Sequence, residues 1–324
     1  DQTYSLDYYA KKIVDYREVD ALLRGCESIS SISRKLKERV AVIQNRLQRL
    51  GKQAIAVQES LIKELLLQED LVADGFESFC GSQYFPCNLN LLVGKESQYL
   101  YMKDYVTLRR KGRMTEEQKE KRSKIEERWK AEPGGIAKSF KKIGERVAKL
   151  YRRRDTGFVR LYTDEHNQYE KGLLKDIDLS RMKNRGVFEH IEVSSKLVRD
   201  KNNPLFSVNY WDRELRKDLA NFVRESTRYG RNIDDLMNRV EIYSVWHNYG
   251  KNYRVKKSCE DTRYHGEVAG IERDRIEDTF TGYYRDRHFF SHQVLSAEGI
   301  RTWFRMWENP FKSGNKYVPL YAGG

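Results

Sequence analysis

Long apolar runs are absent from this sequence of 324 residues. A membrane-spanning helix needs about 18 or more consecutive apolar residues, and no such run occurs, so we expect no membrane span. The first residues also lack a positively charged segment followed by an apolar one, and we therefore expect no secretory leader. Because the sequence begins with Asp1 rather than Met, we expect that an N-terminal piece precedes it.

Cysteine is scarce as well. The sequence has four cysteines without a Cys-x-x-Cys pair, namely Cys26, Cys80, Cys87 and Cys259. A disulfide framework needs denser cysteines and a structural zinc site needs closer ligand pairs, so we expect reduced thiols in a cytoplasmic protein. No glycine-rich phosphate-binding loop occurs, and no nucleotide cofactor is therefore expected.

Positive charge, in contrast, is abundant, with a net charge of +13. Between Arg109 and Arg154 the sequence has 18 Lys and Arg but 7 Asp and Glu, a balance of +11. Such a stripe indicates a polyanionic partner, and a solvated helical surface is the alternative. The cations assigned to a DNA-binding surface are Arg109, Arg110, Lys111, Arg113, Arg152, Arg153 and Arg154.

Residues 1–68 are predicted to be helical. A short helix ends near Gly25, a second runs from a Ser28 cap to Leu36, and a third begins after Lys37. This arrangement is typical of a helix-turn-helix, whose last helix enters the major groove of DNA, although an ordinary helical bundle fits equally well. The side chains expected to contact bases are Gln44, Asn45, Arg46 and Arg49.

Strand-like segments begin after residue 70. The predicted strands cover residues 71–74, 83–93, 97–108, 158–163 and 188–193. The predicted helices cover residues 115–130, 136–153 and about 212–247. The order of three strands, helices, and then further strands predicts an α/β fold in which helices flank a mixed sheet.

Two of these strands carry a carboxylate at one end. Asp74 ends the first strand and Asp164 follows the fourth. In a sheet of the ribonuclease H type these strands are neighbours, so the two carboxylates would share a divalent metal. Hard cations such as Mg2+ prefer oxygen ligands, and two ions about 4 Å apart can activate a water or a 3′-hydroxyl. A turn or helix cap is the ordinary alternative for either Asp alone.

The segments around both carboxylates resemble the acidic motifs of bacterial insertion-sequence transposases of the DDE class. The first comprises Val72-Ala-Asp-Gly-Phe-Glu-Ser-Phe79 with Ser82-Gln-Tyr84, and the second is Thr163-Asp-Glu-His-Asn-Gln-Tyr169. The basic Leu108-Arg-Arg-Lys-Gly-Arg-Met-Thr-Glu-Glu-Gln118 also fits, and Leu23-Arg-Gly-Cys26 through Leu47-Gln-Arg-Leu50 is similar to the preceding helix-turn-helix. The likeness covers roughly residues 20–255.

The resemblance implies a helical DNA-binding region at 1–68, a ribonuclease H-like catalytic domain at 69–255 and a C-terminal extension at 256–324. It further implies Mg2+ (or Mn2+), with two ions, and double-stranded DNA as partner, both as element ends and as target. Strand cleavage, strand transfer and a homo-oligomer on DNA in the bacterial nucleoid would follow. The alternatives are a nuclease of the same fold and a catalytically decayed, sequence-specific DNA-binding protein.

A third acidic residue is less clearly marked. The class places a Glu on a helix after the fifth strand. The segment Arg224-Glu225-Ser226 makes Glu225 the first choice, and Asp212, near the start of that helix, is the second. Both are candidates for catalysis and for metal binding. A helix-surface ion pair is the alternative for Glu225. His166, two residues beyond Asp164, is a candidate neighbour of the site.

Overall fold

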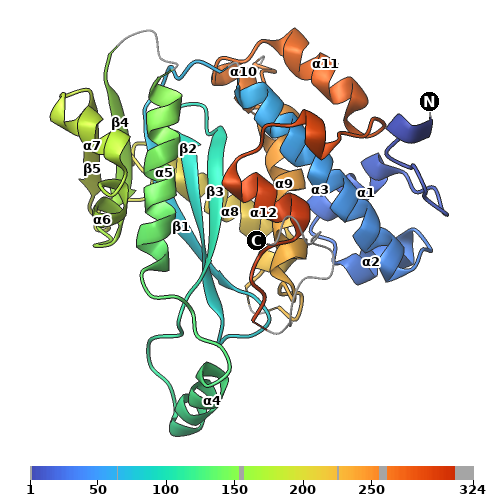
Figure 1. Cartoon of the computed structure of the whole chain (residues 1–324), viewed down its shortest axis with the longest axis horizontal. Coiled ribbons are helices and arrows are strands. Elements are labelled where there is room, and N and C mark those ends of the chain that lie inside the picture. The colour runs from blue at the N-terminus through green and yellow to red at the C-terminus, as the bar shows by residue number, and fades with distance from the viewer. Residues whose placement is uncertain (1, 64, 153–156, 225, 255–260, 311–324) are drawn as a thin grey trace. The chain divides into compact units, whose positions relative to one another are not determined.

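A computed structural model describes residues 2–63, 65–152, 157–224, 226–254 and 261–310 (Figure 1). The chain divides into two compact units. The sheet unit comprises Leu66–Asp212, and the helical unit combines Asp1–Leu65 with Arg213–Gly324. The three-part division into 1–68, 69–255 and 256–324 stays a prediction.

The sheet unit is built on five strands. They are β1 (Leu71–Phe79), β2 (Pro86–Gly94), β3 (Leu100–Thr107), β4 (Val159–Asp164) and β5 (Phe188–Val193). Their order in the sheet is β3-β2-β1-β4-β5. β1 pairs antiparallel with β2 and parallel with β4, whereas β2–β3 is antiparallel and β4–β5 is parallel. The predicted α/β class with a mixed sheet is therefore confirmed, and this topology is compatible with a ribonuclease H-like fold.

Strand β1 is longer than the sequence predicted. It continues to Phe79, so that Asp74 lies inside the strand rather than at its end. The continuation is stabilised by Phe76, which is fully buried, and by antiparallel pairing with β2. Gly75 allows the two strands to approach, because a Cβ there would lie 2.2 Å from Nδ2 of Asn88.

Helices connect the strands, and some of them cover the sheet. In this unit they are α4 (Glu116–Glu126), α5 (Gly135–Tyr151), α6 (Tyr169–Leu173) and α7 (Ile177–Asn184). The apolar side of α5 packs on β2 and β3, and α6 and α7 pack against α5. After β5, the first part of α8 (Phe206–Asp218) is held at the β2–β3 turn, where the Trp211 indole N–H donates to the Gln98 carbonyl at 2.8 Å.

The helical unit is organised around two long helices, α3 (Val40–Ile62) and α9 (Ile233–Tyr249), which pack against each other. A Cβ at Gly51 would lie 2.2 Å from the Asn238 side-chain oxygen, which shows how closely they approach. The surrounding helices are α1 (Tyr16–Arg24), α2 (Ile29–Lys35), α10 (His265–Val268), α11 (Arg273–Tyr283) and α12 (Ala297–Phe304). Among the described residues, no helix has the length and apolar character needed to cross a membrane.

The single long helix predicted at about 212–247 is wrong. The chain forms α8 and α9 with a loop between them, because Leu219 takes an extended backbone conformation (φ −109°, ψ 113°) after α8 ends. Asn232 then starts a new helix, and its side chain accepts from the Asp235 N–H at 3.2 Å. A strong cap thus outweighs the helical periodicity that continues on both sides.

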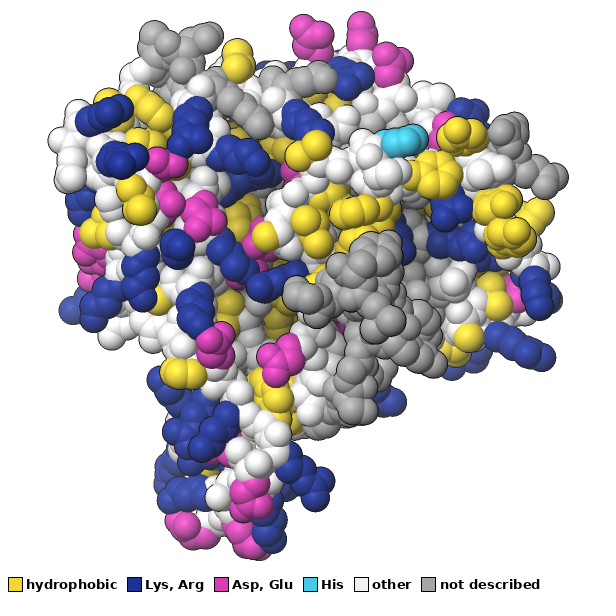
Figure 2. Space-filling model, viewed as in Figure 1, with side chains coloured by type: hydrophobic (Ala, Val, Ile, Leu, Met, Phe, Trp, Pro, Cys, Tyr) yellow, Lys and Arg dark blue, Asp and Glu magenta, His cyan; other side chains and the backbone are white. Residues whose placement is uncertain are grey.

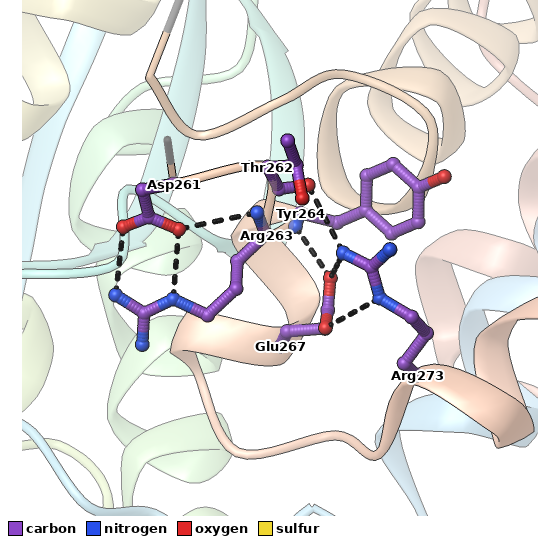
Figure 3. A network of polar contacts seen from close by, with 6 residues as sticks. All are labelled: Asp261, Thr262, Arg263, Tyr264, Glu267 and Arg273. Carbon is purple, nitrogen blue, oxygen red and sulfur yellow. Dashed lines mark hydrogen bonds and ion pairs between the residues drawn. The ribbon is translucent and has the colours of Figure 1, made fainter. Parts of the chain in front are cut away.

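Part of the segment after residue 260 is held by a polar network (Figure 3). The Glu267 carboxylate accepts from the Tyr264 backbone N–H at 2.7 Å and pairs with the Arg273 guanidinium at 2.9 Å. The same guanidinium donates to the Thr262 carbonyl at 3.0 Å. These bonds fix the chain at both ends of α10 and give its charged side chains a structural role.

Candidate active site

The sheet brings Asp74 and Asp164 side by side. The parallel β1–β4 register pairs Leu71 with Leu161 and Val72 with Tyr162. Asp74 and Asp164 lie two residues beyond this last pair, close enough for the charge of Asp164 to raise the pKa of Asp74. Side chains at the same level of neighbouring strands point to the same face, and neighbouring strands lie about 4.8 Å apart. The two carboxylates predicted from the sequence therefore lie close together on neighbouring strands.

The pair is electrostatically unfavourable when both carboxylates are ionised. Burial first, and then the charge of Asp164, raises the pKa of Asp74 from 3.8 to about 6. Two hydrogen bonds act in the opposite direction, since Asp74 Oδ1 accepts from the Gly75 N–H at 2.7 Å and from the Tyr169 hydroxyl at 3.0 Å. A cation between the carboxylates would relieve this repulsion, so the donor set fits a hard divalent metal.

Tyr169 holds the pair from α6. Its ring is buried and stacks on Phe140 with centroids 3.6 Å apart. Burial, followed by the charges of Asp74 and Asp164, raises the pKa of Tyr169 well above its ordinary value. The hydroxyl therefore stays protonated and remains a donor to Asp74. Tyr169 was not predicted as a site residue, although it closes the second acidic motif and begins α6.

His166 lies beside the site, as expected. Its backbone N–H donates to Asp164 Oδ1 at 3.1 Å, and its ring stacks on Tyr169 with centroids 4.8 Å apart. Arg199, in the loop after β5, was not predicted, yet its positive charge lowers the pKa of Asp74. The sequence offered no signal for Arg199, because nothing local links that loop to β1.

A third carboxylate does not join the pair in the described part of the chain. There, no three His, Cys, Asp or Glu side chains are grouped so as to hold a metal ion. Asp212 lies half-buried on α8, after β5. Glu225, the first choice from the sequence, lies outside the described residues. Both assignments stay predictions.

The same unit carries a strongly basic segment, residues 108–134, which we call the basic arm. Its helix α4 has no buried residue and begins with the predicted capping box between Thr115 and Gln118. Figure 1 shows α4 away from the strands, and Figure 2 shows Lys and Arg side chains gathered around it. Within the described residues, several exposed cations of the arm have no ion pair, namely Lys111, Arg113, Arg128 and Lys130.

The β1–β2 turn anchors the basic arm. Arg110 lies over the Tyr84 ring at 4.9 Å, and Phe85 packs against Trp129 with centroids 5.4 Å apart. Arg109 is engaged inside the arm, where it donates to Glu126 at 2.7 and 2.8 Å. Two segments singled out in the sequence, the Ser82-Gln-Tyr84 motif and the basic stretch, are therefore in contact.

The remaining predicted cations lie at the end of α5. Arg152 is exposed and forms an ion pair with Asp178 of α7. Arg153 and Arg154 lie outside the described residues. Further back on α5, Lys142 pairs with Asp104 of β3 at 2.8 Å, so part of the charge of this stretch is used inside the unit.

The predicted helix-turn-helix is not confirmed. Its third helix is the 23-residue α3, which is buried on several sides against the helical unit. Arg46 is buried and donates to the Lys12 carbonyl, and Arg49 donates to the Leu6 carbonyl at 2.6 Å and the Tyr8 carbonyl at 2.9 Å. Of the four side chains expected to contact bases, Gln44 is half-buried and Asn45 is exposed.

Comparisons with known proteins add no family assignment. No model of a known protein family matches the chain, and no curated protein matches it. The features that point to a function are the carboxylate pair, the residues that hold it and the basic arm.

Proposed function

We propose that this chain is a metal-dependent DNA phosphoryl transferase of the DDE transposase type. The observation that carries the proposal is that Asp74 and Asp164 lie on neighbouring parallel strands, close enough for the charge of Asp164 to raise the pKa of Asp74. Like charges in a partly buried site oppose each other, and such a pair suits the binding of a divalent cation. Mg2+, or Mn2+ in its place, would be held by these two carboxylates and by a third acidic residue, Glu225 or Asp212.

When bound, the metal would supply Lewis-acid polarisation of a phosphate and activation of a water or 3′-hydroxyl nucleophile. The protein's own part is to fix the carboxylates. The Tyr169 hydroxyl and the Gly75 N–H hold Asp74 Oδ1, and the His166 N–H holds Asp164 Oδ1. Each bond favours the ionised carboxylate, which is the form that binds a cation.

The basic arm supports DNA as the substrate. Its unpaired cations would neutralise phosphates and release counterions, which gives sequence-independent affinity that falls steeply with salt. The ribonuclease H-like fold, binding of element ends, transfer of 3′ ends into target DNA and assembly of oligomers on DNA belong to the same proposal. These properties are inferred from the resemblance of the acidic motifs to those of DDE-class transposases.

Cleavage of labelled DNA in Mn2+, with Asp74→Asn and Asp164→Asn as matched variants, tests the proposal. We expect the wild-type chain to cut and both variants to lose at least about 1000-fold of the rate while still binding DNA. Cutting without joining of 3′ ends would select the nuclease alternative. Binding by the wild-type chain without any cutting would select the decayed DNA-binding protein and refute the enzyme.

A further inference from the structure

The helical unit contains a cavity of about 500 Å³ in which positive charge and aromatic rings converge. Four cations line it, namely Arg49, Lys52, Arg287 and Arg305, and none of its described lining residues is an Asp or Glu. Aromatic residues line it as well, including Tyr8, Tyr9, Phe289, Phe290 and Trp303. Its volume lies in the range of sites for small organic ligands, about 300–1,000 Å³.

The cations of this cavity are poorly neutralised. Arg305 pairs with Asp235 at 2.8 Å, whereas Arg49 donates to uncharged carbonyl groups. Lys52 lies 5.7 Å from the centre of the Trp303 ring, and among the described residues its ammonium group has no ion pair. Burial first, and then the charges of Arg287, Arg305 and Arg49, lower the pKa of Lys52. The cavity therefore has an excess of positive charge that an anion would neutralise.

Exposed aromatic rings stand beside these cations. Tyr9 is 85% exposed and Phe290 is 40% exposed. Tyr9 also has a positive φ of 57°, a conformation that residues other than Gly, Asn and Asp seldom adopt. The carbonyls of Leu6 and Tyr8, just before Tyr9, accept hydrogen bonds from Arg49. The same side chain that lines the cavity therefore holds this segment. Large apolar rings exposed beside cations are suited to a flat, apolar ligand face attached to an anion.

We propose that this cavity binds one unpaired nucleotide of a DNA strand, with its phosphate among the cations and its base stacked on an exposed aromatic ring. A paired base is unsuitable, because both of its faces are covered by neighbours in the duplex. That the strand is DNA rests on the proposed function. Asn45 and Arg49, which the sequence assigned to the major groove, line the cavity and would contact the single strand here.

Fluorescence anisotropy of the full chain with a labelled oligothymidylate of about ten nucleotides tests this site. EDTA prevents metal-dependent cutting, and excess unlabelled duplex occupies the basic arm. Lys52→Met should weaken binding about tenfold or more and reduce the salt slope by about 0.7, the contribution of one phosphate contact in a single strand. Lys52→Arg should keep the affinity, and Lys63→Met is the matched control, an exposed lysine of the same chain segment outside the cavity.

Tyr9→Asn tests the aromatic contact, because Asn tolerates the positive φ but removes the ring. We expect a loss of about 5- to 150-fold, the contribution of one base–aromatic stack. Tyr9 is largely outside the core, so the variant should melt at the wild-type temperature. An abasic strand of equal length should bind the wild-type chain as weakly as oligothymidylate binds Tyr9→Asn.

Three results would overturn the proposal. They are wild-type affinity in both Lys52→Met and Tyr9→Asn, equal affinity for the abasic strand, and tighter binding of oligouridylate than of oligothymidylate. Because binding is measured in EDTA, a wild-type chain that binds the strand through Lys52 and Tyr9 yet never cuts DNA in Mn2+ would refute the proposed enzyme and leave this site supported.

Discussion

Asp74→Asn is expected to stabilise the chain at neutral and alkaline pH. The pKa of Asp74 is raised from 3.8 to about 6 in the folded chain, so the folded state binds the proton more tightly than the unfolded state. This contribution to stability is complete below about pH 4 and is lost as the pH rises through about 6. The difference corresponds to roughly 3 kcal/mol at about pH 8 and to about 1 kcal/mol at about pH 4.5. Asn cannot ionise, and the variant therefore avoids that cost.

The gain should approach this value because Asn keeps the local hydrogen bonds. Its amide oxygen can still accept from the Tyr169 hydroxyl and the Gly75 N–H, which both reach Oδ1 of Asp74. Bonds to a neutral acceptor are weaker than bonds to a carboxylate, which makes roughly 3 kcal/mol an upper value. Calorimetric unfolding in EDTA at both pH values measures the gain and separates transitions of the two units.

Asp70→Asn is the matched control. Asp70 directly precedes β1 and lies level with Arg160 of β4, with which it forms an ion pair at 3.7 Å. Neutralising it removes an attraction, and we expect a loss of up to about 1 kcal/mol at pH 8. Destabilisation of Asp74→Asn at about pH 8, or an equal gain at both pH values, would contradict the expected cost of ionising Asp74.

Three further predictions concern the carboxylate pair and the basic arm. Mn2+ should raise the melting temperature of the wild-type chain but not of Asp164→Asn, which scanning fluorimetry would reveal, because a ligand of the folded state alone stabilises it. Tyr169→Phe removes a donor that lowers the pKa of Asp74, so the acid limb of the cleavage–pH profile should move to higher pH; an unmoved limb contradicts this. Alanine at Lys111 and Arg113 together should reduce the salt slope of duplex binding by about 1.8, at about 0.9 for each phosphate contact, and an unchanged slope in titrations at several salt concentrations would exclude them from the DNA surface.

Local signals predicted the positions of the five strands and of helices α4 and α5, whereas helices α6 and α7 were not predicted. The fifth strand was predicted at 188–193, where β5 lies, and the Thr115–Gln118 capping box begins α4. These elements are predictable because their structural preferences depend on residues only a few positions apart in the sequence. The neighbouring positions of β1 and β4 were predicted as well, from the strand order of a ribonuclease H-type sheet.

Contacts between distant segments could not be predicted. Arg46 and Arg49 have the polar character of a DNA-reading helix, yet their bonds go to carbonyls of residues 6–12, more than 30 positions away in the chain. Tyr169 gained its role when α6 carried it to Asp74, which lies 95 positions earlier. Periodicity and caps say nothing of such partners, because the sequence pattern around a donor does not contain its acceptor.

The β1–β4 register itself contains the comparison that favours a cation-binding site. At one end of the shared register, Asp70 meets Arg160, a pairing of opposite charges that stabilises the sheet. Four residues further along the two strands lie Asp74 and Asp164, and the charge of Asp164 contributes to raising the pKa of Asp74. Selection for stability alone would favour opposite charges at both ends, since the like-charged pair costs folding energy at neutral pH. Without a metal, the carboxylate pair reduces the stability of the folded chain, yet Tyr169 favours the ionised form of Asp74 that binds cations. This combination is expected of a divalent metal site.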